Sequence, residues 1–365
     1  MIKCDFKPRY KTLHLTNELG SVFYGGVHNV ISQIYERRNA TTGFLLYDEG
    51  DKDFVAEPDV AVVRDTDIPR LLVTLDFDVL VVHHYGYNKI IKPFVGNHPI
   101  VFVMHGMPTP EPTPRDYPFG GHPGTEVAYL SLCKESEVIV VASQAEAAKF
   151  RRIVKDCADK VVVIPMGVTL PETIQMAPLR EERMRLGHIA RGDYRKGLLE
   201  TLRAIRQIPE VELHVACNTA DFRHQTLVND YLEATGIGNR VHFHGFCAGP
   251  RKDAFFAHVD AIVVSSLWEP FGYTVIEPAL YGRTVITANN SGPLEIVGED
   301  YAYQFDPFVI EEQVVAIRRF MSDPQSVIGA EFDKLASRLR AFDGQRMVEQ
   351  YDDLFSTVAY QRVMM

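Results

Sequence analysis

Residues 266–286 read SLWEPFGYTVIEPALYGRTVI and carry two glutamates, Glu269 and Glu277. The apolar run before them, Ala261 to Val264, predicts a buried strand of a parallel sheet. A loop with Glu269 follows, and then a helix from about Tyr273 to Tyr281 that carries Glu277. The first turn of such a helix offers free N–H groups and the positive end of the helix dipole, so we expect an anion such as a phosphate there. The two carboxylates beside it are poor phosphate ligands but good acceptors for hydroxyl groups.

The pattern of strand and helix repeats along the whole chain. Apolar runs separated by helix-length segments indicate repeated βα units and a mostly parallel sheet. The expected strands of the first half are 12–15, 43–47, 79–83, 100–105, 138–142 and 160–165, with helices at 27–36 and 144–154. The second half restarts the pattern with strands at 185–190, 211–216, 241–244 and 261–264 and a helix at 197–205, and closes with helices at 311–321, 330–341 and 349–362. The fold class is therefore α/β, with two Rossmann-like doubly wound domains that face each other across a cleft.

The junction between these domains is expected where Pro165, Gly167 and Pro171 cluster after the last strand of the first half. We predict an N-terminal domain over residues 1–166 and a C-terminal domain over residues 167–344. The closing segment at about 345–365 is expected to pack back on the first domain.

Composition excludes several classes of protein. The net charge of −10 argues against nucleic acid as a partner, because such a partner requires a basic surface. Five scattered cysteines without a C-x-x-C pair indicate reduced thiols rather than disulfides or a zinc site. The polar N-terminus and the lack of an 18-residue apolar run predict a cytoplasmic protein with at most peripheral contact at the inner face of the membrane.

A basic pair follows the first strand of the second half. Arg191 and Lys196 can converge on one diphosphate, with Arg191 as a planar fork and Lys196 as a point charge. Taken alone, a solvated turn explains the pair better. Together with the expected anion site at Tyr273, the diphosphate interpretation is favoured.

Two features of the first half point to the same cleft. Gly25 and Gly26 follow the first strand and let the backbone approach a phosphate, although a tight turn explains them equally well. They do not form the G-x-G-x-x-G pattern, so a dehydrogenase is disfavoured. His105 ends a strand at the carboxyl edge, where it either donates to a sugar hydroxyl and handles a proton or is satisfied by its own loop.

The remaining histidines predict no metal site. His83 and His84 are adjacent on a strand and point to opposite faces. His242 and His244 share a face, but no cysteine or carboxylate is placed to complete a site, so we expect a structural role. The proline-rich residues 107–124 are expected to shape the acceptor side or to act as a spacer.

The chain resembles the retaining glycosyltransferases of family 4, the group 1 glycosyl transferases with the GT-B fold. The resemblance covers most of the chain, and its most specific block is Ala261 to Glu277, which joins the paired glutamates to Pro-Phe-Gly. The other matching segments are Gly25 to Val27, His105-Gly106, Val140 to Ser143, Val163 to Val168, Arg191 with Lys196-Gly197, and Val241 to Phe246. Departures at Met166, Pro278 and Asn290 bear on donor identity more than on the reaction class.

The resemblance implies a nucleotide-diphosphate sugar donor bound mainly by the second domain, with the first domain on the acceptor side. Arg191 and Lys196 would neutralise the diphosphate, Glu269 would accept from sugar hydroxyls, and Glu277 from the ribose. The other residues implied in donor binding are Gly25, Gly26, Phe246, Phe271, Gly272, Tyr273 and Thr274, and His105 would contact the sugar. We expect His105, Arg191, Lys196 and Glu269 to be the catalytic set.

The implied reaction is metal-independent transfer of a hexose, with a UDP-sugar favoured, to a hydroxyl on a glycan, a lipid-linked glycan or a small molecule, in polysaccharide or glycoconjugate synthesis. No cofactor is expected. No enzyme nucleophile stands out beside the donor, which favours a same-face dissociative substitution. Two alternatives remain: a nucleotide-sugar epimerase of the same fold, and an idle nucleotide-sugar-binding protein.

Overall fold

The computed structural model describes residues 10–16, 26–38, 42–47, 60–64, 66–107, 123–180, 183–218 and 221–363. The chain forms two compact units, one of Met1–Thr169 with Phe342–Met365 and one of Leu170–Ala341. The sequence placed the corresponding junctions after residues 166 and 344. Gly25 and most of the proline-rich segment lie outside the described residues.

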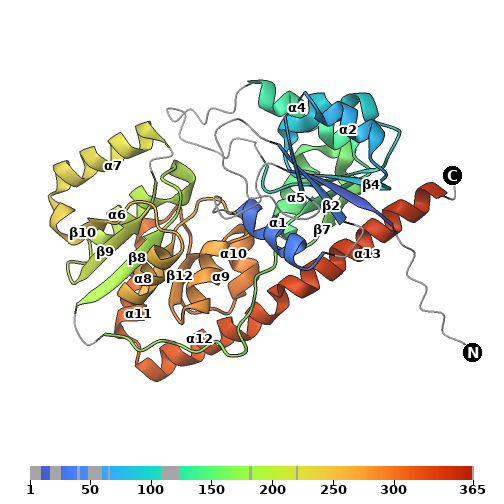
Figure 1. The fold of residues 1–365 in the computed structure, drawn as a ribbon. Coiled ribbons are helices and arrows are strands. Elements are labelled where there is room, and N and C mark those ends of the chain that lie inside the picture. Colours follow the sequence, from blue (N-terminus) through green and yellow to red (C-terminus); the bar gives the residue numbers. More distant parts are fainter. Residues whose placement is uncertain are drawn as a thin grey trace, which may run out of the picture. The chain divides into compact units, whose positions relative to one another are not determined.

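The first unit is a seven-stranded sheet of order β3-β2-β1-β4-β5-β6-β7, in which every pair is parallel (Figure 1). The order reverses direction between β1 and β4, which is the switch point where doubly wound sheets bind ligands. The six predicted strands are confirmed, whereas the edge strand β3 was missed. The strands are β1 Thr12–Thr16, β2 Thr42–Tyr47, β3 Val60–Val63, β4 Val79–Val82, β5 Ile100–Val103, β6 Val138–Val141 and β7 Val161–Val163.

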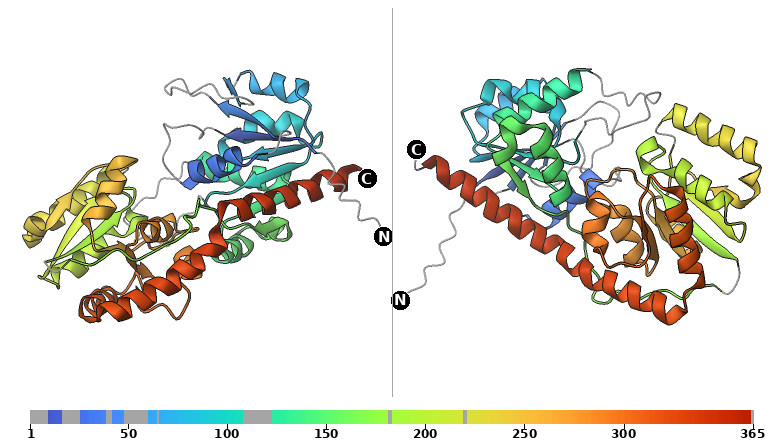
Figure 2. Two further views of the ribbon diagram at one scale, coloured as in Figure 1. Left: turned by 60° about the horizontal axis from the view of Figure 1, so that its bottom comes forward. Right: turned by 180° about the vertical axis from the view of Figure 1, so that it is seen from behind.

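Helices of this unit cover a sheet whose central strands are buried on both faces. Buried strands with no polar alternation, such as β4 and β5, require this two-sided cover. The C-terminal helix α13, drawn in red in Figure 2, contacts α1 and β4. Tyr10 Oη donates to the Asp352 carbonyl at 2.8 Å. The helices are α1 Gly26–Glu36, α2 Ile68–Thr74, α3 Asn88–Ile91, α4 Pro123–Glu135, α5 Gln144–Ile153 and α13 Gly344–Val363.

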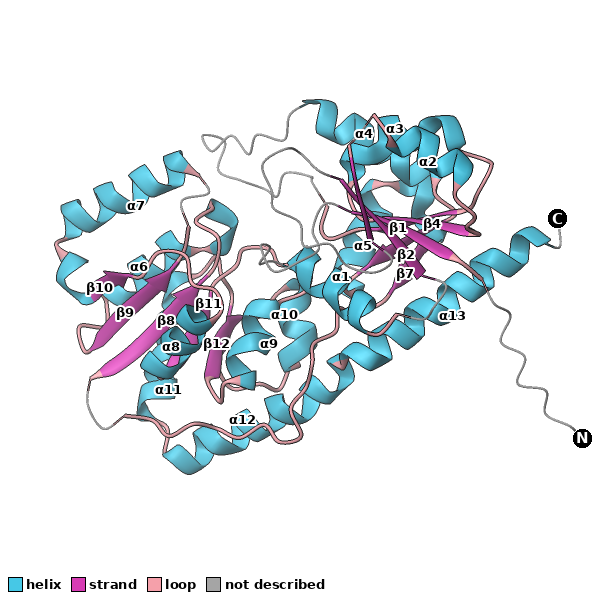
Figure 3. Cartoon of the chain, in the orientation of Figure 1, coloured by secondary structure: helices cyan, strands magenta, loops and turns pink. Residues whose placement is uncertain are grey.

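The second unit is a six-stranded parallel sheet of order β10-β9-β8-β11-β12-β13 (Figure 3). This is the Rossmann strand order, and its switch point lies between β8 and β11. The predicted strands are confirmed at their positions, with β9 and β11 matching to the residue. The strands are β8 Met184–Ile189, β9 Val211–Ala216, β10 Val241–Phe243, β11 Ala261–Val264, β12 Thr284–Ala288 and β13 Gln304–Phe305.

Seven α-helices of this unit lie in the described part of the chain. They are α6 Leu198–Arg206, α7 Phe222–Thr235, α8 Pro250–His258, α9 Tyr273–Leu280, α10 Ser291–Val297, α11 Ile310–Ser322 and α12 Gln325–Leu339. The predicted helix after the glutamate loop is confirmed as α9. Pro278 lies inside α9, and the N–H groups of Tyr281 and Arg283, just beyond the helix, both donate to the Pro278 carbonyl. No helix within the described ranges is both long and apolar enough to cross a membrane.

Candidate active site

The loop after β8 is organised by Asp193. Its backbone caps a short 3₁₀ turn, Tyr194–Lys196, and its carboxylate accepts from the Arg195 N–H at 3.1 Å. The same carboxylate lies 3.3 Å from the Arg191 guanidinium, whose side chain is 59% exposed. Arg191 therefore stands at the surface of this loop with its guanidinium oriented by Asp193. Sequence reasoning missed Asp193, although a Gly-Asp pair after a strand is a turn signal.

Gly197 brings this loop against the end of β11. Its φ is +68°, and a Cβ there would lie 2.0 Å from the carbonyl oxygen of Ser265. Ser265 Oγ donates to the Gly197 carbonyl at 2.8 Å and lies 2.7 Å from the Thr201 hydroxyl. Only glycine allows both the left-handed conformation and so close an approach.

Lys196 and Glu269 meet as a result. The Lys196 ammonium forms an ion pair with Glu269 Oε2, and each side chain is only 14% exposed. The two residues are 73 positions apart in sequence, but they follow β8 and β11, which are neighbours at the switch point. Lys196 and Glu269, which sequence analysis identified separately, therefore lie in one site.

The loop that carries Glu269 is held by the start of α10. The Glu269 N–H donates to Ser291 Oγ at 3.1 Å, and the Gly292 N–H donates to the Glu269 carbonyl at 3.0 Å. A Cβ on Gly292 would lie 1.9 Å from the Phe271 carbonyl oxygen, and Asn290 Nδ2 donates to the Leu267 carbonyl at 2.8 Å. The segment Asn290-Ser-Gly thus positions the carboxylate, a role that sequence analysis did not assign to it.

The first turn of α9 presents donors beside this pair. Gly272 precedes the helix at φ +124°, which turns the chain so that the helix begins at Tyr273. In a helix, the first N–H groups have no intrahelical acceptor. The Thr274 hydroxyl is buried and has no hydrogen-bond partner among the residues described. An unsatisfied hydroxyl at a helix start is a natural donor to a ligand oxygen.

Glu277 lies one turn further along α9 and pairs with Lys252 of α8. Lys252 Nζ is 3.2 Å from Glu277 Oε1, and both side chains are partly buried. Lys252 was not predicted as a site residue, and a Pro-Arg-Lys-Asp helix start gives no sequence signal for it. Phe246, in the loop after β10, is 48% exposed.

His105 belongs to a chain of three histidines in the first unit. His83 Nδ1 lies 3.2 Å from His105 Nε2, and His83 Nε2 lies 3.0 Å from His14 Nδ1. Burial lowers the pKa of His14 and of His105 to about 3, and that of His83 well below its usual value. The three rings are therefore neutral at physiological pH. His105 Nδ1 is buried and has no hydrogen-bond partner in the described ranges. The row of three histidines therefore ends on a ring nitrogen that is available to a ligand.

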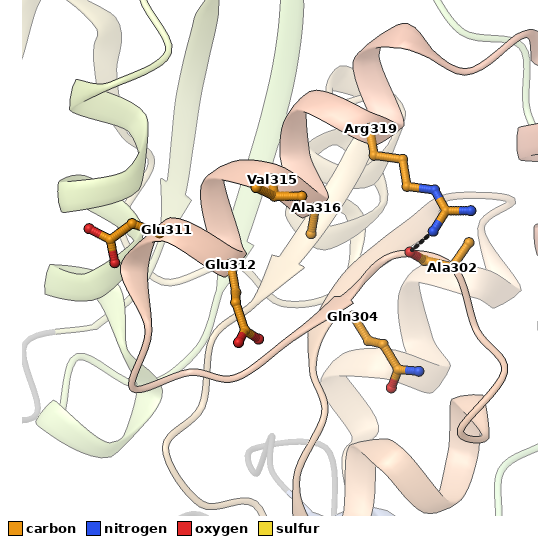
Figure 4. Close-up of a pocket in the computed structure, with 7 residues that line it drawn as sticks. All are labelled: Ala302, Gln304, Glu311, Glu312, Val315, Ala316 and Arg319. Atoms are coloured by element: carbon orange, nitrogen blue, oxygen red, sulfur yellow. Dashed lines mark hydrogen bonds between the residues drawn. The ribbon is translucent and has the colours of Figure 1, made fainter.

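The second unit also has a hollow that lies away from this site. It has a volume of about 280 Å³ and lies between β13 and α11, where Arg319 Nη1 donates to the Ala302 carbonyl at 3.1 Å (Figure 4). Its other lining residues are Gln304, Glu311, Glu312, Val315 and Ala316. None of the predicted site residues lines it.

Comparison with known proteins identifies the second unit. Residues 171–339 match the family model described as glycosyl transferases group 1. The second unit belongs to the group 1 glycosyl transferases. An uncharacterized glycosyltransferase of Methanocaldococcus jannaschii, MJ1607, is 27% identical over 189 residues, which is 46% of each protein. The mannosylfructose-phosphate synthase of Agrobacterium fabrum is 29% identical over 28% of this chain and 24% of its own length. The chain therefore matches less than half the length of these relatives.

Solved structures resemble the fold of this chain over both units. Anabaena HepE, in complex with UDP and glucose, has a TM-score of 0.77 at 19% identity and covers 95% of this chain and 100% of its own. Sucrose-phosphate synthase of Thermosynechococcus elongatus has a TM-score of 0.75 at 16% identity, with 95% of this chain and 99% of its own covered. At these identities the likeness establishes the two Rossmann-like domains of the GT-B fold and nothing finer.

Proposed function

We propose that the chain transfers a hexose from a nucleoside-diphosphate sugar to a hydroxyl acceptor, with retention at the anomeric carbon. The observation that carries the proposal is the Lys196–Glu269 pair at the β8/β11 switch point, beside the first turn of α9. A cation for a diphosphate, a carboxylate for sugar hydroxyls and free helix N–H groups occur together there, which is the set that an activated sugar requires.

In the free protein, Lys196 and Glu269 satisfy each other. When a donor binds, its diphosphate replaces Glu269 as the partner of Lys196, and the freed carboxylate accepts from hydroxyls of the sugar. After the exchange the Lys196 ammonium is paired with the diphosphate and the Glu269 carboxylate is hydrogen-bonded to hydroxyls, so neither partly buried charge is left without a partner. The two side chains that bind the donor are thus already in position in the free protein.

The departing diphosphate is stabilised by Arg191, Lys196 and the N-terminus of α9. Positive charge that is fixed in place before the reaction stabilises the transition state without a metal ion. In the donor complex Glu269 is assigned to the sugar hydroxyls, which disfavours it as a covalent nucleophile. We therefore propose a same-face dissociative substitution: the bond from the anomeric carbon to the leaving oxygen breaks, and the acceptor oxygen attacks from the same side as its proton passes to the leaving phosphate.

A uridine nucleotide is the favoured donor. The HepE structures contain UDP and UDP-glucose, which supports uridine for a chain of the same fold. Glu277 is assigned to the ribose, with Lys252 holding the carboxylate in place, and Phe246 offers an exposed ring to the base. The acceptor is a hydroxyl on a glycan, a lipid-linked glycan or a small molecule.

Two measurements test the proposal. Thermal shift against a panel of nucleotides and nucleotide sugars should give stabilisation by UDP and UDP-sugars, because a ligand of the folded state raises stability by mass action. Glu277→Ala should weaken UDP binding, while Glu269→Ala should reduce transfer and leave UDP affinity nearly unchanged. The reverse pattern contradicts the assignment, and the absence of any nucleotide binding overturns the function.

The same assays separate the alternatives. An epimerase converts the donor sugar with no acceptor present. An idle binding protein binds UDP but shows neither transfer nor slow donor hydrolysis. Transfer that survives a chelator supports metal-independent chemistry, and a covalent sugar adduct on a protein carboxylate would overturn the same-face mechanism.

A further inference from the structure

The edge of the second sheet carries a cluster of metal-ligating side chains that the transfer reaction does not use. Glu212 and His214 lie two residues apart on β9, and His242 on β10 is the register partner of His214. Residues at i and i+2 of a strand share a face, so the three side chains lie on one side of the sheet. Their ligand atoms all lie within 4.8 Å of one another. The expectation that no carboxylate is placed near His242 and His244 is therefore wrong, because Glu212 comes from the neighbouring strand.

The carboxylate of Glu212 faces the two imidazoles with one oxygen. Its Oε2 lies 3.9 Å from Nε2 of His214 and 3.9 Å from Nε2 of His242. Its Oε1 lies 3.5 Å from the guanidinium of Arg183. Arg183 thus holds one oxygen, and the other is directed to the two ring nitrogens.

His214 is the buried member and its free nitrogen points into the cluster. The residue is 5% exposed, and its Nδ1 lies 3.0 Å from His244 Nε2. When Nδ1–H donates to His244, the lone pair of the ring is on Nε2. That nitrogen is buried and makes no hydrogen bond with any residue described, although a buried nitrogen normally has a partner. An imidazole whose second nitrogen is held by a hydrogen bond is the usual arrangement of a metal-binding histidine.

We propose that Glu212, His214 and His242 bind one divalent transition-metal ion of the zinc class, with His244 orienting His214. Two imidazoles and one carboxylate are zinc ligands, and the fourth position is open to water because His242 is 42% exposed on its side chain. Donor atoms of a tetrahedral zinc site lie about 3.3–3.5 Å apart, given bonds of about 2.0–2.1 Å. The two 3.9 Å separations from Glu212 Oε2 therefore need to shorten by about 0.5 Å, and the separation between the two imidazoles, which is within 4.8 Å, by up to about 1.4 Å.

The position of the ion defines its role. Strand β10 has three residues and lies at the sheet edge, paired only with β9 in the described sheet. An ion shared by Glu212, His214 and His242 cross-links the two strands. It touches none of Lys196, Glu269 or Glu277, so its role is to stabilise the edge and not to act in the transfer.

The test uses the full chain, stripped of metal with a chelator and titrated with Zn²⁺ by calorimetry. We expect one ion per chain, a higher Tm, and, with Co²⁺ in place of Zn²⁺, the intense visible absorption of a tetrahedral site. His242→Asn and Glu212→Gln should each lower the Zn²⁺ affinity at least tenfold. His84→Asn is the matched control, because His84 is an exposed histidine outside the cluster, and it should change the affinity less than twofold.

Three outcomes would overturn the inference. They are unchanged Zn²⁺ affinity in His242→Asn and Glu212→Gln, an equal loss in His84→Asn, or a Co²⁺ spectrum of a weak octahedral complex. Because His242 is half exposed, His242→Asn is expected to fold, and circular dichroism checks this. Binding of UDP is measured on the same samples, so failure of the metal site is distinguished from failure of the proposed transferase function.

Discussion

The two units place different chemistry at the same topological position. In the first unit the switch point lies between β1 and β4, where His14 and His83 stack with ring centroids 5.3 Å apart and lead on to His105. In the second unit it lies between β8 and β11, where Lys196 pairs with Glu269. One site is a row of neutral rings and the other is a pair of charges. The strand order fixes where a ligand site lies, but the residues at the carboxyl edge decide whether it suits an anion or a neutral hydroxyl.

The largest expected effect is on the charged switch point. Lys196→Ala should lower the transfer rate by about 10²–10³, the usual loss when a fixed positive partner of the leaving group is removed. Arg203→Ala is the control, because Arg203 is an exposed cation on α6 that pairs with Glu200, and it should retain the rate within twofold. Equal rates for Lys196→Ala and the wild type would remove the reason for assigning the donor to this unit.

The close contact between Gly197 and the Ser265 carbonyl can be disrupted without changing the charged residues. Gly197→Ala should lower the free energy of unfolding of the second unit by at least about 3 kcal/mol, since it adds a backbone clash to the left-handed strain. Gly236 is the matched control, because it has the same φ of +68° with no atom within 4 Å of an added Cβ. Gly236→Ala should cost only about 1–2 kcal/mol, the price of the conformation alone. Denaturant unfolding of the two variants measures the difference, and similar values would mean that the contact with Ser265 is unimportant.

The neutral row in the first unit predicts acid sensitivity. Burial lowers the pKa of His14 from 6.5 to about 3 in the folded protein. Below pH 6.5 the unfolded chain therefore binds a proton that the folded chain does not, and stability falls as the pH drops toward 3. The loss is about 1.4 kcal/mol per pH unit for each such histidine. His14→Asn should make the free energy of unfolding of the first unit less dependent on pH between 6.5 and 5. The slope should fall by the contribution of one histidine, about 1.4 kcal/mol per pH unit. Equal slopes in the two proteins would show that His14 is not buried as a neutral ring.

The smallest expected effect concerns the orientation of His105. His83→Asn removes the ring that contacts His105 Nε2 and should lower kcat by about tenfold with little change in KM for the donor. His98→Asn, at a histidine of the first unit that contacts Phe77, should leave kcat unchanged. If both variants behave alike, His83 has only a packing role.

The sequence by itself determined the α/β class, the two-unit organisation and the family. These depend on local signals, such as apolar runs of strand length and the block from Ala261 to Glu277, and β9 and β11 were located to the residue. Strand β13 was missed because two residues show no periodic pattern, whereas β3 at the sheet edge was missed although it is as long as β4 and β5.

Only the tertiary structure decided which side chains meet. Lys196 reaches Glu269, and Glu212 reaches His242, because β8 lies beside β11 and β9 beside β10. The row from His14 to His105 depends in the same way on the neighbours β1, β4 and β5. Strand order is set by the packing of whole units, so contacts between residues far apart in sequence leave no local pattern that a reader of the chain can find.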